Sequence, residues 1–376
     1  MSASVKEKAD RAEARASGKK PEFEFKSGDD SEAESPSGMW SKIKFPELTS
    51  NGAPRKNSMM NVRRVIDFLD IDVRYDEFLN VYTISGAGME KFSGELNDMM
   101  TRKFRELCFQ RTGYEPGPQG AFEGLMRHGE ENKFHSLLAQ LDILKWDGVP
   151  RLNNWLTTYC GAEDTPLHRE WGRLWLTAAV RRPYDPGCKF DHVLVMEGPE
   201  GGGKSSVGKI IACGQATQRP QYFSDSPVLD KSEREQQELT RGVWIYELAE
   251  LAGLRKGDLH RIKAFVTREE ERAREAYARL HSRQPRIPVF LGTFNTDAVT
   301  GRLVQYLNPG DWRRWWPLLV GVVHKIELDA LARDRRQLLA EAKAKAEPLA
   351  GVKGWASLQD NVQNLSHFQD WRLLLE

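Results

Sequence analysis

The chain has 376 residues, and its 55 Lys and Arg residues nearly balance its 54 Asp and Glu residues. That length allows one full α/β domain, a smaller domain and a tail, while a formal net charge of +1 excludes a globally basic DNA-binding protein. No apolar run approaches the ~20 residues of a membrane span, and the charged N-terminus is unlike a signal peptide. The four scattered cysteines include no C-x-x-C pair, which favours buried free thiols in a reducing compartment. We therefore expect a cytoplasmic protein without a membrane partner.

Composition distinguishes two N-terminal segments. Residues 1–38 are rich in Lys, Glu, Ala and Ser and have few apolar side chains, which predicts a disordered tail. Residues 58–145 form a small module, either α+β or all-helical, whose function the pattern does not indicate. Its expected elements are a helix at 61–69, a turn and strand at 73–84, and helices near 93–108 and 132–144.

Residues 146–325 alternate between helical and strand patterns, which predicts a three-layer α/β core with a mostly parallel sheet. Short apolar runs predict strands at 192–197, 243–246 and 288–294. Helical patterns occur at 154–181, 206–212, 231–240 and, in a basic region, 254–280. A charged amphipathic helix at 326–346 opens the C-terminal helical segment, residues 326–376.

The turn after the first core strand fits the phosphate-loop pattern G-x-x-x-x-G-K-[ST]. It reads Gly198-Pro199-Glu200-Gly201-Gly202-Gly203-Lys204-Ser205 and is followed by Ser206. Glycines let the backbone wrap a phosphate, and the N–H groups at the start of the next helix point at the anion. We expect Lys204 to reach the β- and γ-phosphates and Ser205 to ligate Mg²⁺, with ATP as the nucleotide. The alternative is a glycine-rich turn that binds nothing, which the flanking strand and helix disfavour.

The second and third core strands end in polar residues suited to hydrolysis. Glu247 ends the second strand and Glu250 follows one turn later, so one carboxylate can serve Mg²⁺ and the other can act as general base. The third strand ends at Asn295, whose amide is placed to sense the γ-phosphate. The alternatives are an ordinary acidic strand end and an Asn that closes a turn.

Two regions suggest partners. Arg313 and Arg314 lie among three tryptophans, either stacked at the edge of the fold or, in a closed oligomer, placed to supply an arginine finger to a neighbouring subunit. Positions 255–286 hold ten Lys and Arg residues against five Asp and Glu residues, a local net charge of +5. This region suits either contacts to DNA phosphates or a solvated helix with i,i+4 ion pairs.

Taken in order, these motifs resemble the virulence-associated E family of phage, plasmid and genomic-island proteins, P-loop ATPases related to superfamily 3 helicases. The resemblance covers roughly residues 140–345. The matching segments are 144–152, 186–191, 197–206, 246–251, 263–267, 292–295, 313–317 and 334–342.

The resemblance implies an AAA+-like core, a hexameric ring and ATP-driven movement on DNA in a bacterial host cell. It implies phosphate and Mg²⁺ binding by Lys204 and Ser205, an acidic motif of Glu247 and Glu250, a sensor at Asn295 and a finger at Arg313 or Arg314. Residues expected to contact DNA are Lys263, Arg268, Arg274, Tyr277, Arg279 and Arg283. Asp311-Trp312 precedes the arginines where relatives usually show Gly-Asn, and no primase domain is recognisable, so priming is expected from a separate protein.

The sequence therefore predicts an ATP-dependent DNA helicase or translocase that acts as a ring on single-stranded or forked DNA. The alternative is an ATP-regulated replication initiator or assembly protein that does not unwind DNA processively. A small-molecule phosphotransferase is disfavoured because the paired arginines and the basic region have no evident use in one.

Overall fold

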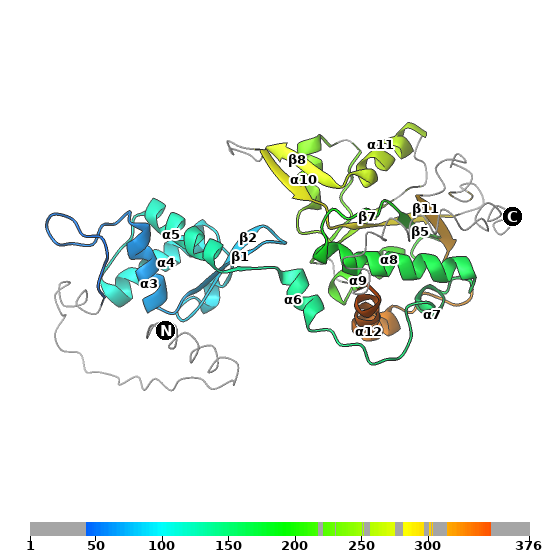
Figure 1. Ribbon diagram of the computed structural model, residues 1–376, viewed down its shortest axis with the longest axis horizontal. Coiled ribbons are helices and arrows are strands. Elements are labelled where there is room, and N and C mark those ends of the chain that lie inside the picture. Colours follow the sequence, from blue (N-terminus) through cyan, green and yellow to red (C-terminus); the bar gives the residue numbers. More distant parts are fainter. Residues whose placement is uncertain are drawn as a thin grey trace.

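The computed structural model describes residues 43–216, 221–229, 231–249, 251, 256–274, 281–296, 301, 303 and 314–346. The predicted tail, residues 1–38, lies outside this part, as do residues 347–376. A small sheet with its helices lies at one end of the molecule and a larger sheet with its own helices at the other (Figure 1).

The N-terminal module is α+β, which decides between the two predicted alternatives. Its sheet has the order β3-β2-β1-β4, with β1 antiparallel to β2 and parallel to β4. The predicted turn and strand at 73–84 is a hairpin of two strands. The elements are α3 (Met59–Phe68), β1 (Asp72–Asp76), β2 (Val81–Ser85), η2 (Glu90–Phe92), β3 (Gly94–Glu95), α4 (Asp98–Thr112), α5 (Pro118–Glu131) and β4 (Lys133–Phe134).

Helix α5 was not predicted, because its glycines lower helix propensity. The structure gives one of them a packing reason. A Cβ on Gly124 would lie 2.5 Å from a methyl carbon of Val62, so the glycine lets α5 approach α3 closely. Tertiary contact therefore outweighs the local preference.

The larger sheet has five strands in the order β11-β5-β10-β7-β6, and every pairing is parallel. This confirms the predicted mixed α/β architecture with a mostly parallel sheet. Its strands are β5 (Val193–Gly198), β6 (Phe223–Ser224), β7 (Ile245–Leu248), β10 (Val289–Asn295) and β11 (Trp315–Leu319). The helices around it are α6 (Ser136–Asp142), α7 (Trp155–Cys160), α8 (Pro166–Tyr184), α9 (Lys204–Cys213), α10 (Glu233–Thr240), α11 (Lys256–Thr267) and α12 (Leu328–Ala346).

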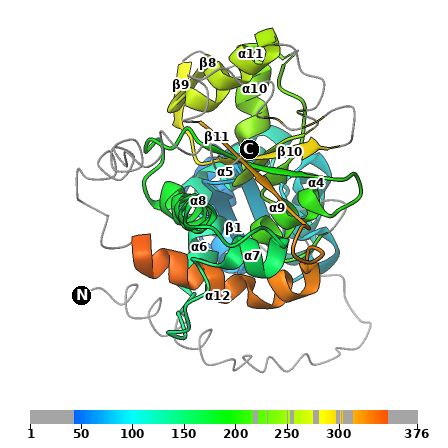
Figure 2. The ribbon, with the colours of Figure 1, turned by 90° about the vertical axis from the view of Figure 1, so that its right-hand side faces the viewer.

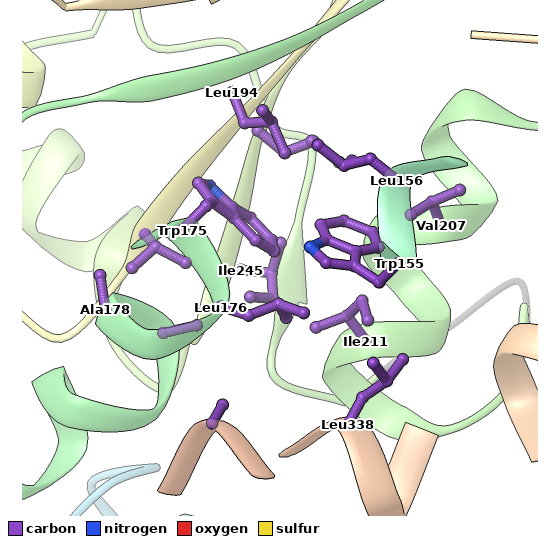
Figure 3. Packing of buried hydrophobic residues seen from close by; sticks show 14 of the residues in the cluster. Trp155, Leu156, Trp175, Leu176, Ala178, Leu194, Val207, Ile211, Ile245 and Leu338 are labelled. Carbon is purple, nitrogen blue, oxygen red and sulfur yellow. The ribbon is translucent and has the colours of Figure 1, made fainter. Parts of the chain in front are cut away.

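Helices cover both faces of the larger sheet (Figure 2). Because side chains alternate along each strand, Leu194 and Ile245 face a core shared with α7, α8, α9 and α12. Trp155 and Trp175 fill the middle of that core (Figure 3). The opposite face, including Phe290, packs against α11.

The basic region predicted to be helical at 254–280 is corrected by the structure. Helix α11 ends at Thr267, and β8 (Glu270–Arg274) pairs antiparallel with β9 (His281–Pro285) in a hairpin outside the main sheet. Glu271 forms a buried ion pair with Arg286, fifteen residues later, which i,i+4 patterning cannot reveal. A long-range contact therefore selects the strand.

Strand β11 was not predicted either, since its sequence was interpreted only as an Arg-Trp cluster. It pairs with β5 at the edge of the sheet, where Pro317, which lacks an N–H, is tolerated. Trp316 stacks on His192, with ring centroids 4.4 Å apart. Trp315 and Trp316 are thus packed inside the fold, whereas Trp312 lies outside the described residues.

The four cysteines are free, as predicted. Cys108 and Cys160 are buried as expected, whereas Cys188 and Cys213 are only half-buried. Among the described residues, no helix has both the length and the apolarity that crossing a membrane requires.

Candidate functional site

The predicted phosphate loop is the turn between β5 and α9. Strand β5 ends at Gly198, and α9 begins at Lys204. Gly201 and Gly203 have φ angles of 72° and 88°, a left-handed conformation that side chains disfavour. Gly203 is the N-cap of α9, whose first N–H groups lack partners within the helix and suit an anion.

Lys204 is buried and folded back onto this loop. Its Nζ donates to the carbonyl oxygens of Gly198 at 2.8 Å and Pro199 at 2.6 Å. Burial lowers the pKa of Lys204, and the carboxylates of Glu200 and Glu247 oppose that shift. Both acceptors are neutral carbonyl oxygens of the phosphate loop, so the oxygens of a phosphate bound at the loop can replace them as partners of the ammonium.

Glu247 lies at the carboxyl edge of the sheet, beside the start of α9. Its Oε1 accepts hydrogen bonds from Ser205 Oγ at 2.7 Å and Thr293 Oγ1 at 2.8 Å. Its Oε2 is buried and has no hydrogen-bond partner among the described residues. Burial raises the pKa of Glu247, the two hydroxyl donors lower it, and nearby Asp225 raises it. Sequence reasoning placed Ser205 and Glu247 together but missed Thr293 and Asp225.

The donor set at this point fits Mg²⁺. Ser205 gives its hydroxyl proton to Glu247, so the lone pairs of its oxygen remain available to a cation. With the unpartnered Oε2 of Glu247, the chain offers two hard oxygen ligands. No group of three His, Cys, Asp or Glu residues gathers for a metal in the described part of the chain. A cation here would therefore complete its shell with phosphate and water.

The third strand brings Asn295 to the phosphate loop. Strand β10 lies between β5 and β7, and Asn295 pairs in register with Gly198. The side chain is half-buried. Glu250, the second predicted carboxylate, lies outside the described residues. The sensor and general-base roles stay predictions.

Of the two predicted finger residues, Arg313 lies outside the described residues. Arg314 precedes β11 at the amino edge of the sheet, where its Nε donates to Asp191 Oδ2 at 3.0 Å and both side chains are largely buried. Trp315, the residue after Arg314, pairs with Val193, and the phosphate loop starts five residues later on β5, at Gly198. At the rise of an extended strand, the loop is therefore about 17 Å from the start of β11. Arg314 is therefore held within the fold, far from the phosphate loop of the same chain.

The residues predicted to contact DNA are distributed over α11 and the β8–β9 hairpin. Lys263 is half-buried on α11, and Arg283 is exposed on β9. Arg268 donates to Gln236 Oε1 at 2.9 Å and lies 3.7 Å from Glu271, so part of its charge is used within the fold. Arg274 is on β8, and its register partner is His281. Tyr277 and Arg279 lie outside the described residues.

The chain is similar to one protein family and to several solved structures. Residues 140–369 match the virulence-associated protein E-like domain. The apo structure of the NrS-1 C-terminal region (305–718) is similar at 13% identity and a TM-score of 0.46, covering 78% of this chain and 69% of that one. A structure described as SCCmec type IV Cch, active helicase, is similar at 12% identity and a TM-score of 0.29, covering 73% and 60%. No curated protein sequence matches the chain.

Proposed function

Because the match covers more than half of its length, the chain belongs to the virulence-associated protein E-like family, and from this premise we propose that it is a DNA-directed ATPase. The observation that carries the proposal is the hydrogen bond between Ser205 and Glu247, which joins the phosphate loop to the acidic strand. In this proposal the enzyme acts as a ring in the replication of a phage or mobile element. An AAA+-like core suits the parallel sheet, in which the Asn295 strand separates the loop strand from the acidic strand.

Each residue of the site has one task in the proposed hydrolysis. The N–H groups at the start of α9 bind the phosphates of ATP, and Lys204 leaves its two carbonyl partners to pair with them. Ser205 and Glu247 would hold Mg²⁺, and the bound ion would supply positive charge against the charge that develops on the phosphates. Asn295 orients the attacking water, and Glu250 accepts its proton.

The proposed ring is supported by the position of Arg314 and of strand β11. The proposed phosphate site lies at the carboxyl edge of the sheet, so an arginine that acts on the transferred phosphate has to reach that edge. Strand β11 starts at the opposite, amino edge of the sheet to which it belongs. A head-to-tail contact places the amino edge of one subunit against the site of the next, and a closed repeat of that contact is a ring. With Arg314 anchored to Asp191, we assign the finger role to Arg313.

DNA is the proposed partner of the β8–β9 hairpin and α11. Arg283 on β9 is exposed, and an exposed guanidinium suits contact with a phosphate backbone. The second candidate function, an initiator that assembles on DNA without processive unwinding, uses the same surface. The two differ in whether hydrolysis is coupled to strand displacement.

The test begins with ATP hydrolysis by the full chain, with and without single-stranded DNA, over a range of salt concentrations. We expect DNA to stimulate hydrolysis and salt to reduce that stimulation. Lys204→Ala should abolish hydrolysis, whereas Lys133→Ala, which removes an exposed lysine of the N-terminal module, should not change it. Equal hydrolysis by both variants would contradict the proposed site.

Strand displacement on a forked duplex separates the two candidate functions. A helicase should release the strand only with ATP, and light scattering should show a particle larger than a monomer. Hydrolysis without displacement would favour the initiator. A particle that stays monomeric with ATP and DNA would exclude the ring and, with it, an arginine supplied by a neighbour.

A further inference from the structure

Thr293, on the sensor strand β10, donates to the same carboxylate oxygen as Ser205. In the parallel pairing of β7 with β10, Glu247 lies opposite Leu291, and Thr293 comes two residues later. Since side chains alternate, Leu291 and Thr293 point to the same face of the sheet as Glu247. The Thr293 hydroxyl is buried and lies 2.8 Å from Glu247 Oε1.

The two hydroxyl donors reach Glu247 from different elements of the fold. Ser205 belongs to the first turn of α9, and Thr293 to a neighbouring strand. Two donors on Oε1 fix the rotation of the carboxylate and leave Oε2 buried without a hydrogen bond from any described residue. An unsatisfied buried carboxylate oxygen is costly, and a cation at that oxygen would remove the cost.

We propose that Thr293 is a positioning residue, which holds the Glu247 carboxylate so that Oε2 faces a divalent cation bound at the phosphate loop. This inference rests on the proposed function. Thr293 itself does not touch nucleotide or metal; it acts through Glu247. The strand that ends in Asn295 thereby has a second role, because it also aligns the metal ligand of the neighbouring strand.

A purely structural role for Thr293 makes a different prediction. If its hydroxyl only satisfied a buried carboxylate, its loss would lower the free energy of unfolding and leave cation binding unchanged. The proposal instead requires a change in cation affinity that exceeds any change in nucleotide affinity. Thr293→Val keeps the shape of the side chain and removes the donor, and Thr293→Ser keeps the donor.

The experiment measures Mn²⁺ binding by electron paramagnetic resonance, with full-length protein and ADP. Mn²⁺ is a suitable probe because it prefers the oxygen ligands that Mg²⁺ prefers. ADP affinity without metal is measured separately by calorimetry. Thr177→Val is the matched control, since Thr177 is also buried but donates to the carbonyl oxygen of Arg173 within α8.

We expect Thr293→Val to weaken Mn²⁺ binding on the order of tenfold, which is the lower end of the range for the loss of one hydrogen bond to a charged group. ADP affinity without metal should stay unchanged, Thr293→Ser should restore most of the loss, and Thr177→Val should bind Mn²⁺ as the native chain does. Native Mn²⁺ affinity in Thr293→Val would overturn the inference, as would equal losses in Thr293→Val and Thr177→Val. If the native chain binds neither ADP nor Mn²⁺ with ADP, the proposed function itself fails.

Discussion

The ion pair between Asp191 and Arg314 allows a test of whether Arg314 is a structural residue, which would leave the finger role to Arg313. The guanidinium Nε lies 3.0 Å from Asp191 Oδ2, with side chains 9% and 12% exposed. The Nη1 atom of Arg314 is buried and has no hydrogen-bond partner in the described part of the chain. Asp191 is therefore the principal compensation for a buried positive charge.

The magnitude follows from this burial. Breaking a fully buried ion pair by removing one partner costs about 3–5 kcal/mol, because the other charge is left uncompensated. The two side chains are 9% and 12% exposed, so the pair is not completely buried and the lower end of that range applies. We therefore expect Asp191→Asn to lower the free energy of unfolding by about 3 kcal/mol. Arg314→Met should cost a similar amount. The double variant leaves neither charge uncompensated, so it should be more stable than the sum of the single losses predicts, by about 1–3 kcal/mol.

The assay combines urea unfolding, followed by tryptophan fluorescence, with ATP turnover at a temperature where every variant is folded. An anchoring Arg314 predicts reduced stability in both single variants. Arg313→Ala should instead keep native stability and ATP affinity while lowering turnover by a factor of 10³ or more, the lower end of the range for an arginine finger. An Arg314→Met variant that keeps native stability yet loses turnover, beside an Asp191→Asn variant that changes neither, would show that Arg314 is not an anchor.

Three further predictions test the packing of the core. Gly208→Ala should lower the free energy of unfolding by about 1 kcal/mol in a urea titration, because a Cβ there would lie 2.9 Å from a methyl carbon of Leu291 on β10. The control Gly257→Ala should not lower it, because a Cβ at Gly257 would have no atom within 4 Å. Glu341→Leu should lower the free energy of unfolding by about 2–4 kcal/mol and expose the segment before α7 to protease, since Glu341 Oε2 accepts hydrogen bonds from two backbone N–H groups there. Glu341→Gln keeps an acceptor and should resist the protease better. Burial raises the pKa of the Cys160 and Cys188 thiols. Alkylation of half-buried Cys188, followed by mass spectrometry, should therefore accelerate about tenfold per pH unit near pH 8, because the reactive thiolate is the minor form there. Buried Cys160 should stay unmodified in the native protein. Rapid modification of Cys160 would contradict its burial.

Much of the site was predictable because it is contiguous in the chain. The strand, the glycine turn, Lys204 and Ser205 follow one another directly, and each local preference agrees with the next. The apolar run before Glu247 likewise predicts a strand that ends in a carboxylate. Since parallel strands present their carboxyl ends at one edge, the sequence also predicted that Glu247 and Asn295 would approach the loop.

The errors at β8 and β11 share one physical cause. Strand β8 was predicted as helix because alternating Arg and Glu residues fit i,i+4 pairing, and the buried contact of Glu271 with Arg286 has no local signature. Strand β11 was missed because its pairing partner, β5, lies more than a hundred residues earlier. Local patterns record only the preferences of neighbours, whereas these strands are stabilised by distant ones.

The sequence by itself determined the chemistry of the phosphate loop, since glycine conformations and a helix N-terminus depend on residues that are adjacent in the chain. Only the tertiary structure decided how that chemistry is supported. Thr293 reaches Glu247 across 46 residues, and Asp191 anchors Arg314 across 123. Both contacts depend on strand register and burial, which are properties of the packed sheet and not of any one segment.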